Sequence, residues 1–382
     1  MASQMKAIQL TEYVKGPLDL TPTTLPRPTP KPDESLIRIH AAATNFFDLL
    51  QIAGKYQNQP PFPWIAGAEF AGIVEEIGAG SSSFKTGDKV FGYVQGAYAE
   101  YCCVKTSTLL PVPKGWSFAD AAGLFITAPT SYAALTIRAE AKRGEWVLVH
   151  AGAGGVGLFA IQVAKAVGCT VIATASTAEK LAICKRFGAD HVISYSDTDW
   201  VKEVLRLRPG GVDIVFDPVG LINQSLKCTA WNGRLLIIGF AAGAIEQVPM
   251  NRVLLKNVSL VGVHWGEYMK KGVEAGTVER VWRDILGMIG EGKIKPITNE
   301  KVYEGLENVG KALKALGARE TWGKVVAKKV VRPWERTLGK QCGISLYPPL
   351  IGSWSFGETP EKGSVGYIED LDTLLEYQML IR

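Results

Sequence analysis

The chain has 382 residues, of which 47 % are apolar and 21 % are charged, and its formal net charge is +5. This length is more than one ordinary core accommodates and predicts two domains, while the composition is typical of a globular protein. Because the net charge is small and Lys and Arg form no long run, no nucleic-acid partner is expected. The N-terminal segment Met1–Tyr13 lacks the apolar core of a signal peptide, so the cytoplasm is the expected location.

The N-terminal third of the chain is punctuated by glycine and proline and contains short β-rich runs. The predicted strands are Met5–Leu10, Ser35–Ala43, Phe70–Ile77, Lys89–Val94 and Ala97–Val104. Short strands separated by turns indicate a small closed β domain. Residues 120–135 follow it and are typical of a linker that enters a helix.

A strand, a glycine-rich turn and a helix follow one another from Trp146 onward. Trp146–His150 is an apolar run typical of a strand buried on both faces of a parallel sheet. The turn after it contains Gly152, Gly154, Gly155, Val156 and Gly157. In a Gly-x-Gly-x-x-Gly pattern the first glycine permits a tight turn, the second lets a pyrophosphate approach, and the third lets the helix pack on the strand. This context predicts dinucleotide binding at the helix N-terminus, with a purely structural turn as the alternative.

The same stretch is nearly uncharged over residues 146–164, which raises the alternative of a membrane span. Its glycine density and the amphipathic helices that follow favour a sheet protein, so no membrane span is expected. Further strands are predicted at Cys169–Thr174, His191–Tyr195, Val212–Asp217, Arg234–Gly239 and Val258–Val263, with helices at Thr177–Phe187 and Thr198–Leu207. Together they predict a doubly wound, parallel, six-stranded sheet. Ligands bind such sheets beyond the carboxyl ends of the strands, so Val219, Gly220, Gly239 and Phe240 are expected to border the cofactor.

The end of the second strand indicates which cofactor is bound. Sites for NAD usually place a carboxylate there, whereas this chain has Thr174–Thr177 with Lys180 shortly after. Hydroxyls and an ammonium suit a 2′-phosphate, so NADPH is expected. The alternatives are that Ser176 or Thr177 only caps a helix and that Lys180 is only a solvated helix residue.

Six cysteines and four histidines are spread along the chain without a spacing typical of zinc ligands or of a disulfide framework. No metal site is therefore expected, and the thiols are interpreted as buried apolar side chains.

Several motifs in the same order carry a family resemblance. They are the turn at 151–157, Gly188–Tyr195, Asn45-x-x-Asp48, Gly67–Gly72 and Trp322–Val326. Together they resemble the medium-chain dehydrogenase/reductase superfamily over about residues 5–330, and within it the quinone oxidoreductase, or zeta-crystallin-like, branch. The resemblance implies an α/β protein with a GroES-like catalytic domain, residues 1–127 and 270–331, around a Rossmann domain, residues 128–269. Residues 332–382 lie beyond the family's usual end and form an extension of unassigned order, with a candidate amphipathic helix at Tyr367–Tyr377.

The resemblance also implies roles for individual residues. Zinc-dependent members carry a cysteine near Asn45 and a histidine at the position of Ala68, so this chain is placed with the zinc-free branch. Ser176, Lys180 and Tyr195 become the expected contacts of the 2′-phosphate, and Thr127 is expected near the nicotinamide.

At the substrate cleft the resemblance implies Asn45, Asp48 and Tyr56. The structural alternatives are a turn residue for Asn45, a helix cap for Asp48 and an aromatic wall for Tyr56. Leu50 stands where quinone reductases often have tyrosine, which makes the expected pocket more apolar.

The expected reaction is hydride transfer from NADPH to a small hydrophobic quinone or to the C=C bond of an α,β-unsaturated carbonyl. An enoyl-thioester reductase and a non-catalytic, NADPH-binding protein of crystallin type are the alternatives. A homodimer is a further possibility that the sequence leaves open.

Overall fold

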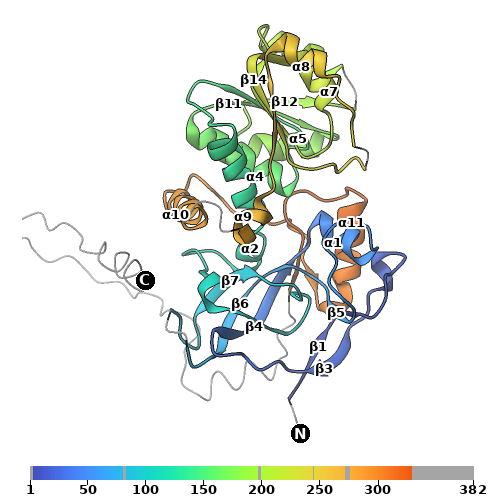
Figure 1. Cartoon of the computed structure of the whole chain (residues 1–382), viewed down its shortest axis with the longest axis vertical. Coiled ribbons are helices and arrows are strands. Elements are labelled where there is room, and N and C mark those ends of the chain that lie inside the picture. Colours follow the sequence, from blue (N-terminus) through green and yellow to red (C-terminus); the bar gives the residue numbers. More distant parts are fainter. Residues whose placement is uncertain (1–2, 81–82, 197–198, 244, 272–275, 329–382) are drawn as a thin grey trace, which may run out of the picture. The chain divides into compact units, whose positions relative to one another are not determined.

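Two large sheets organise the fold in the computed structural model, which describes residues 3–80, 83–196, 199–243, 245–271 and 276–328. One is parallel and six-stranded, and the other is mostly antiparallel and seven-stranded (Figure 1). The predicted fold class, α/β with a GroES-like β-rich part and a Rossmann-type sheet, is confirmed. The division of the chain into domains at 127, 269 and 331 stays a prediction.

The parallel sheet has the strand order β12-β11-β10-β13-β14-β15, and every neighbouring pair is parallel. Its strands are β10 (Trp146–Val149), β11 (Thr170–Ala175), β12 (His191–Ser194), β13 (Val212–Asp217), β14 (Thr229–Ile237) and β15 (Ser259–Gly262). The chain moves outward from β10 to one edge, returns to β13 beside it, and then moves to the other edge. The crevice beyond the carboxyl ends of β10 and β13 is where such a doubly wound sheet binds its ligand.

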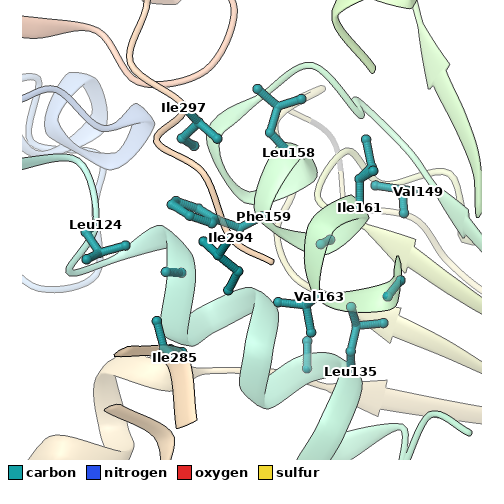
Figure 2. Close-up of a cluster of buried hydrophobic side chains, with 14 of the residues drawn as sticks. Leu124, Leu135, Val149, Leu158, Phe159, Ile161, Val163, Ile285, Ile294 and Ile297 are labelled. Carbon is teal, nitrogen blue, oxygen red and sulfur yellow. The ribbon is translucent and has the colours of Figure 1, made fainter. Parts of the chain in front are cut away.

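Helices connect these strands and bury the sheet. They are α4 (Gly155–Val167), α5 (Ala178–Arg186), α6 (Trp200–Leu207), α7 (Ile222–Ser225) and α8 (Met250–Lys256). Helix α4 ends at Gly168, whose φ of 98° is a left-handed conformation that glycine adopts without strain. Figure 2 shows the apolar side chains Leu158, Phe159, Ile161 and Val163 of α4 in one cluster with Leu124, Leu135, Val149, Ile285, Ile294 and Ile297. Residues from before and after the parallel sheet therefore share the core of α4.

The antiparallel sheet is completed from the far end of the sequence. Its main order is β16-β17-β4-β6-β7-β9, with β8 also paired to β4. The strands are β4 (Glu34–Ala43), β6 (Glu69–Ile77), β7 (Lys89–Tyr93), β8 (Tyr101–Lys105), β9 (Leu110–Pro111), β16 (Tyr303–Glu304) and β17 (Val326–Lys328). Because β17 pairs with residues 41–43 of β4, the chain returns after the Rossmann-type sheet to complete the β-rich part.

The remaining helices lie in and beside this β-rich part and where the chain enters and leaves the parallel sheet. They are α1 (Phe46–Ile52), α2 (Phe118–Ala122), α3 (Thr127–Tyr132), α9 (Trp265–Lys271), α10 (Thr277–Gly290) and α11 (Val309–Gly317). The predicted linker at 120–135 is thus largely helical, since α2 occupies its start and α3 continues into the wider helical segment Ala133–Arg138.

Three predicted strands differ from the structure by more than one residue at an end. The run Met5–Leu10 divides into β1 (Gln4–Ala7) and β2 (Gln9–Leu10), which pair with β3 (Thr23–Pro26) and β5 (Trp64–Ile65). The division falls at Ile8, whose N–H donates to the Tyr98 carbonyl instead. Residues 98–100 form one bridge, at Ala99, between two bends, and the Tyr98 N–H donates to the Ala66 carbonyl at 2.8 Å, so strand β8 begins only at Tyr101.

The third difference concerns β14. It begins at Thr229 and ends at Ile237, whereas the predicted strand is Arg234–Gly239. Its pairing with β13 is irregular between Thr229 and Arg234, where Asn232 has a φ of 61°, so this part of the strand contains a bulge.

Three other expectations concern the cysteines, a membrane span and the C-terminal extension. The five cysteines within the described ranges are free thiols, four of them buried, which confirms their interpretation as apolar side chains. Within those ranges, every helix is too short or too polar to cross a bilayer. The candidate helix at Tyr367–Tyr377 lies outside the described residues.

Candidate functional site

The glycine turn between β10 and α4 has the steric properties of a phosphate-binding turn. A Cβ atom at Gly157 would lie 2.5 Å from the Ala151 carbonyl oxygen, and one at Gly152 would lie 2.9 Å from Ala173 Cβ. A Cβ atom at Gly154 would meet only the Ala151 oxygen, at 3.2 Å. Gly152 and Gly157 are therefore needed for packing, while Gly154 faces open space that a pyrophosphate can occupy.

Gly155 makes room for protein side chains rather than for a ligand. A Cβ atom there would lie 3.1 Å from Lys324 Cδ and 3.2 Å from Thr127 Cγ2. Thr127 is held by its hydroxyl, which donates to the Gly123 carbonyl at 2.9 Å. The next residue of the turn, Val156, accepts a hydrogen bond from Ser131 Oγ at 2.7 Å through its carbonyl. The start of α4 is thus fixed against α3, and Thr127 lies beside the turn; its place near the nicotinamide stays a prediction.

A second cation joins Lys180 beyond the carboxyl end of β11. Lys180 Nζ donates to the Arg319 carbonyl at 2.5 Å, and the Arg319 guanidinium donates to the Ala241 carbonyl at 3.1 Å. Burial lowers the pKa of Lys180, and the Arg319 charge lowers it further against the opposing effect of Glu179. Burial raises the pKa of Tyr195, and the Arg319 charge opposes this by lowering it. Two neighbouring cations and a phenol are an arrangement that a bound anion would stabilise.

Ser176 precedes this cluster, at the end of β11. Its carbonyl accepts a hydrogen bond from Ser196 Oγ at 3.2 Å, and Thr177 rather than Ser176 caps α5 by accepting from Lys180 N–H. The helix-cap alternative is therefore true of Thr177, and Ser176 Oγ is not used as the cap.

The carboxyl end of β13 forms a tight turn around Asp217. Its carboxylate accepts from the N–H groups of Val219 at 2.8 Å, Gly220 at 2.9 Å and Leu221 at 2.5 Å. These N–H groups are already paired within the chain, so any contact of Val219 and Gly220 with a cofactor must use other atoms. At the end of β14, a Cβ atom at Gly239 would meet only the Pro218 carbonyl oxygen, and the neighbouring Phe240 is 40 % exposed.

The N-terminus of α1 brings two predicted substrate residues together. Asn45 is the residue before the helix, and its N–H donates to Asp48 Oδ2 at 2.8 Å. The same oxygen accepts from the Tyr98 hydroxyl at 2.6 Å. Asp48 is only 1 % exposed, and within the described ranges its Oδ1 has no hydrogen-bond partner. The helix-cap role of Asp48 is therefore real, and it leaves one carboxyl oxygen unused.

Burial also changes the protonation of Asp48. Desolvation raises the pKa of its carboxyl to about 7, against the opposing effects of Tyr98, the Asn45 N–H and Lys324. A carboxyl that titrates near neutrality is available as a proton source or as a charge that changes with pH.

Asn45 also belongs to a buried network of charged groups. Its Oδ1 accepts from Lys324 Nζ at 2.7 Å, and its Nδ2 donates to Glu69 Oε1 at 3.0 Å. Lys324 and Glu69 form an ion pair in which both side chains are at most 3 % exposed. The second oxygen of Glu69 accepts from the Ile126 N–H at 3.1 Å. A buried carboxylate and ammonium thus compensate each other around the Asn45 amide.

Tyr56 follows α1 in the chain and lies near enough to Asp48 to feel its charge. Its ring stacks on Phe47 with a centroid distance of 5.3 Å, so the wall alternative describes its packing. Burial raises the pKa of Tyr56, and the Asp48 charge raises it further. The pKa of Tyr93 is raised by burial and by both of these groups. Tyr56, Tyr93 and Asp48 are therefore electrostatically coupled, and the phenols keep their protons at neutral pH.

Four important residues were not assigned a role from the sequence: Glu69, Tyr98, Arg319 and Lys324. Glu69 and Lys324 are charges inside the apolar motifs Gly67–Gly72 and Trp322–Val326, and a charge within a run expected to be buried is the signal of a buried ion pair. Arg319 stands in a turn with a φ of 58°, and nothing in its sequence context distinguishes it.

Comparisons with known proteins agree with this geometry. The family model described as the alcohol dehydrogenase GroES-like domain matches residues 31–114, and the model described as zinc-binding dehydrogenase matches residues 155–282. Quinone oxidoreductase-like protein 2 of Rattus norvegicus is 37 % identical over 318 residues, which are 82 % of this chain and 89 % of that protein.

Two solved structures extend the likeness to three dimensions. A mycobacterial protein in complex with NADPH is 33 % identical with a TM-score of 0.77, over 85 % of this chain and 99 % of that one. Quinone oxidoreductase of Escherichia coli in complex with NADPH is 28 % identical with a TM-score of 0.75 and the same coverage. The chain therefore belongs to the medium-chain dehydrogenase/reductase superfamily, in its quinone oxidoreductase branch.

Proposed function

We propose that this protein is an NADPH-dependent oxidoreductase that reduces a quinone, or the C=C bond of an α,β-unsaturated carbonyl, without a metal ion. The observation that carries the proposal is the group at the start of α1. There Asn45 offers an amide N–H donor beside Asp48, a carboxyl whose pKa is raised to about 7. The charge of Asp48 in turn acts on the protonated phenol of Tyr56. Such donors suit a substrate whose oxygen gains negative charge during reduction.

The residues around the glycine turn fit NADPH. Gly154 leaves space for the pyrophosphate at the N-terminus of α4, and the cations Lys180 and Arg319 suit the 2′-phosphate together with Ser176 and Tyr195. Bound NADPH supplies the hydride. The chain's own contribution is to hold the cofactor through these residues, and Thr127 is proposed to lie against its nicotinamide end.

At the substrate end, Asn45 and Tyr56 are proposed to donate hydrogen bonds to the carbonyl or quinone oxygen. As charge develops on that oxygen, each donor stabilises it without having to move. The hydroxyl of Tyr56 then provides the proton. Deprotonated Asp48 opposes loss of that proton because its negative charge raises the pKa of Tyr56.

A catalytic zinc ion does not fit the residues at this position. Within the described part of the chain, His, Cys, Asp and Glu form no group of three that could hold a metal. Lys324 Nζ already lies among the oxygens of Thr44, Asn45 and Glu69, so a cation is present in the form of an ammonium. No step of the proposed reaction passes through a metal.

The test is a substrate screen with the purified chain. NADPH absorbance is followed with a quinone, an enone and an enoyl thioester, and Asn45→Ala serves as the control variant. The proposal is supported if NADPH is oxidised in the presence of the quinone or the enone, and if this oxidation is slower in the variant. Activity confined to the thioester favours an enoyl-thioester reductase, and NADPH binding without oxidation of any substrate favours the non-catalytic, crystallin-type alternative.

We further propose a homodimer in the cytoplasm. Strand β15 is the last strand of the parallel sheet within the described residues, so one edge of it is open to pairing with a second copy. The neighbouring helix α8 has no buried residue and exposes Met250, Leu254 and Leu255 by 67 %, 77 % and 72 %. Sedimentation of the wild type and of Leu254→Glu tests this, and a monomeric wild type would rule it out.

A further inference from the structure

Lys324 reaches the Asn45 side chain from a segment more than 250 residues further along the chain. The lysine is 3 % exposed, and its Nζ donates to three oxygens: the Thr44 carbonyl at 2.9 Å, Asn45 Oδ1 at 2.7 Å, and Glu69 Oε1. All three donor positions of the ammonium are therefore used. Its charge is compensated by Glu69, which has no exposed surface.

The stem of Lys324 lies in a channel made by two glycines. A Cβ atom at Gly123 would lie 2.8 Å from Lys324 Cβ and Cγ, and one at Gly155 would lie 3.1 Å from its Cδ. The neighbouring Gly323 donates its N–H to the Ala153 carbonyl at 2.8 Å, within the glycine turn between β10 and α4. The lysine is thus held from its backbone to its tip, and its ammonium is a fixed group.

This ammonium and the Glu69 carboxylate together fix which way the Asn45 amide points. With Oδ1 facing Lys324 and Nδ2 facing Glu69, both ends of the amide meet charges of the favourable sign. If the amide rotated by half a turn, its N–H₂ would face an ammonium and its oxygen would face a carboxylate. In the described part of the chain, Asn45 Nδ2 donates one of its two hydrogens, to Glu69 Oε1. The second hydrogen of Nδ2 is therefore available to a ligand.

We propose that Lys324 is a positioning residue that fixes Asn45 as an N–H donor to the substrate oxygen. The inference rests on the proposed function, because it explains how the donor of that reaction keeps its orientation. Without the ammonium, Asn45 Oδ1 loses its donor and only Glu69 still favours the present orientation. When the charge of Glu69 is removed as well, the two orientations become similar in free energy, and one of them presents a lone pair to a substrate oxygen that is gaining negative charge. Catalysis then loses an oriented donor, while the cofactor turn remains intact.

The test separates orientation from charge balance by using two variants of the full-length chain. Lys324→Met keeps the stem but leaves the Glu69 carboxylate buried without its counter-ion, so it is expected to lower both the thermal midpoint and the turnover. The double variant Lys324→Met/Glu69→Gln removes both charges and is expected to recover most of the thermal midpoint. The glutamine amide introduced in this variant can pair with either end of Asn45, so the orientation is not restored. Lys311→Met, on the exposed side of α11, is the matched control.

The expected result is that kcat of the double variant stays about 100-fold or more below wild type, as when one donor to a developing oxyanion is lost, while the Kd for NADPH is unchanged. Recovery of turnover together with the thermal midpoint would overturn the inference, because Lys324 would then only balance the charge of Glu69.

A second measurement does not depend on turnover. In protein labelled with ¹⁵N-asparagine, the two side-chain N–H signals of Asn45, identified by their absence in Asn45→Ser, are expected to be well separated and slow to exchange with water. In the double variant they are expected to approach each other and to exchange faster. Signals that are the same in both proteins would refute the positioning role. If the wild type oxidised NADPH with none of the substrates tested, the proposed function would be refuted instead. The amide signals would still decide the role of Lys324.

Discussion

Replacing Asp48 by asparagine should remove a pH dependence of stability that the wild-type protein carries. The folded-state pKa of Asp48 is about 7, against an ordinary value of 3.8, and burial is the main cause. Between these two pH values the folded protein binds more protons than the unfolded chain, so the free energy of unfolding falls as the pH rises. The contribution of Asp48 to this free energy is fully present below the unfolded pKa and is lost as the pH rises through the folded pKa. From about pH 5 to about pH 8 the loss amounts to ~2.5 kcal/mol.

The substitution is conservative in shape and in hydrogen bonding. The amide oxygen of the introduced asparagine can still accept from the Asn45 N–H and from the Tyr98 hydroxyl, which both bind Oδ2 in the wild type. Urea unfolding of both proteins at the two pH values measures the effect. The wild type should lose ~2.5 kcal/mol more than Asp48→Asn as the pH is raised, since every other group titrates alike in both.

Turnover should follow the same titration. Ionised Asp48 raises the pKa of Tyr56 and makes its hydroxyl a poorer acid, so kcat of the wild type should fall above about pH 7 and that of Asp48→Asn should not. An equal pH dependence of stability in the two proteins would refute the argument. A ¹³C carboxyl signal of Asp48 that titrates near its ordinary value would do so as well.

Three further predictions concern the other parts of the site. Tyr56→Phe should lower kcat with little change in the Kd for NADPH, and unchanged kcat would remove Tyr56 from the proton-transfer role. Lys180→Ala and Arg319→Ala should each weaken NADPH binding about tenfold or more in fluorescence titrations, with little effect on NADH, because each removes a cation from the proposed 2′-phosphate site; equal losses for both cofactors would contradict this. Gly157→Ala should destabilise the fold by about 1–3 kcal/mol because its Cβ would overlap the Ala151 and Gly152 carbonyl oxygens, whereas Gly287→Ala, exposed in α10 with no neighbour in reach, should stabilise it by about 0.5–1 kcal/mol; thermal unfolding of both variants measures the difference.

The sequence predicts well those features that depend on local patterns. The strands of the parallel sheet and the glycine turn were expected because burial, β-branched residues and glycine spacing all occur within a short window. Where the outcome depends on a distant partner, local patterns do not suffice. Strand β1 ends before Ile8 because the N–H of Ile8 donates to Tyr98, and no property of the run Met5–Leu10 indicates that bond.

The candidate site shows the same division. Asn45 and Asp48 are found from a short motif, and their capping geometry follows from it. The ion pair of Glu69 and Lys324 joins residues 255 positions apart, and neither position alone predicts its partner. Arg319 reaches Lys180 through a backbone carbonyl, a kind of contact that residue types cannot encode.

The origin of β17 at the far end of the sequence also has a consequence for biosynthesis. Lys324 and Asn45 are 279 residues apart, and strand β4 can receive β17 only when residues 326–328 have been made. At common rates of translation this interval lasts between about 15 and 55 s. During that time Glu69 has no ammonium to face, and residues 41–43 of β4 lack their partner strand. The nascent β-rich part must therefore wait in an incomplete form while the Rossmann-type sheet, whose strands follow one another directly in the chain, can already fold.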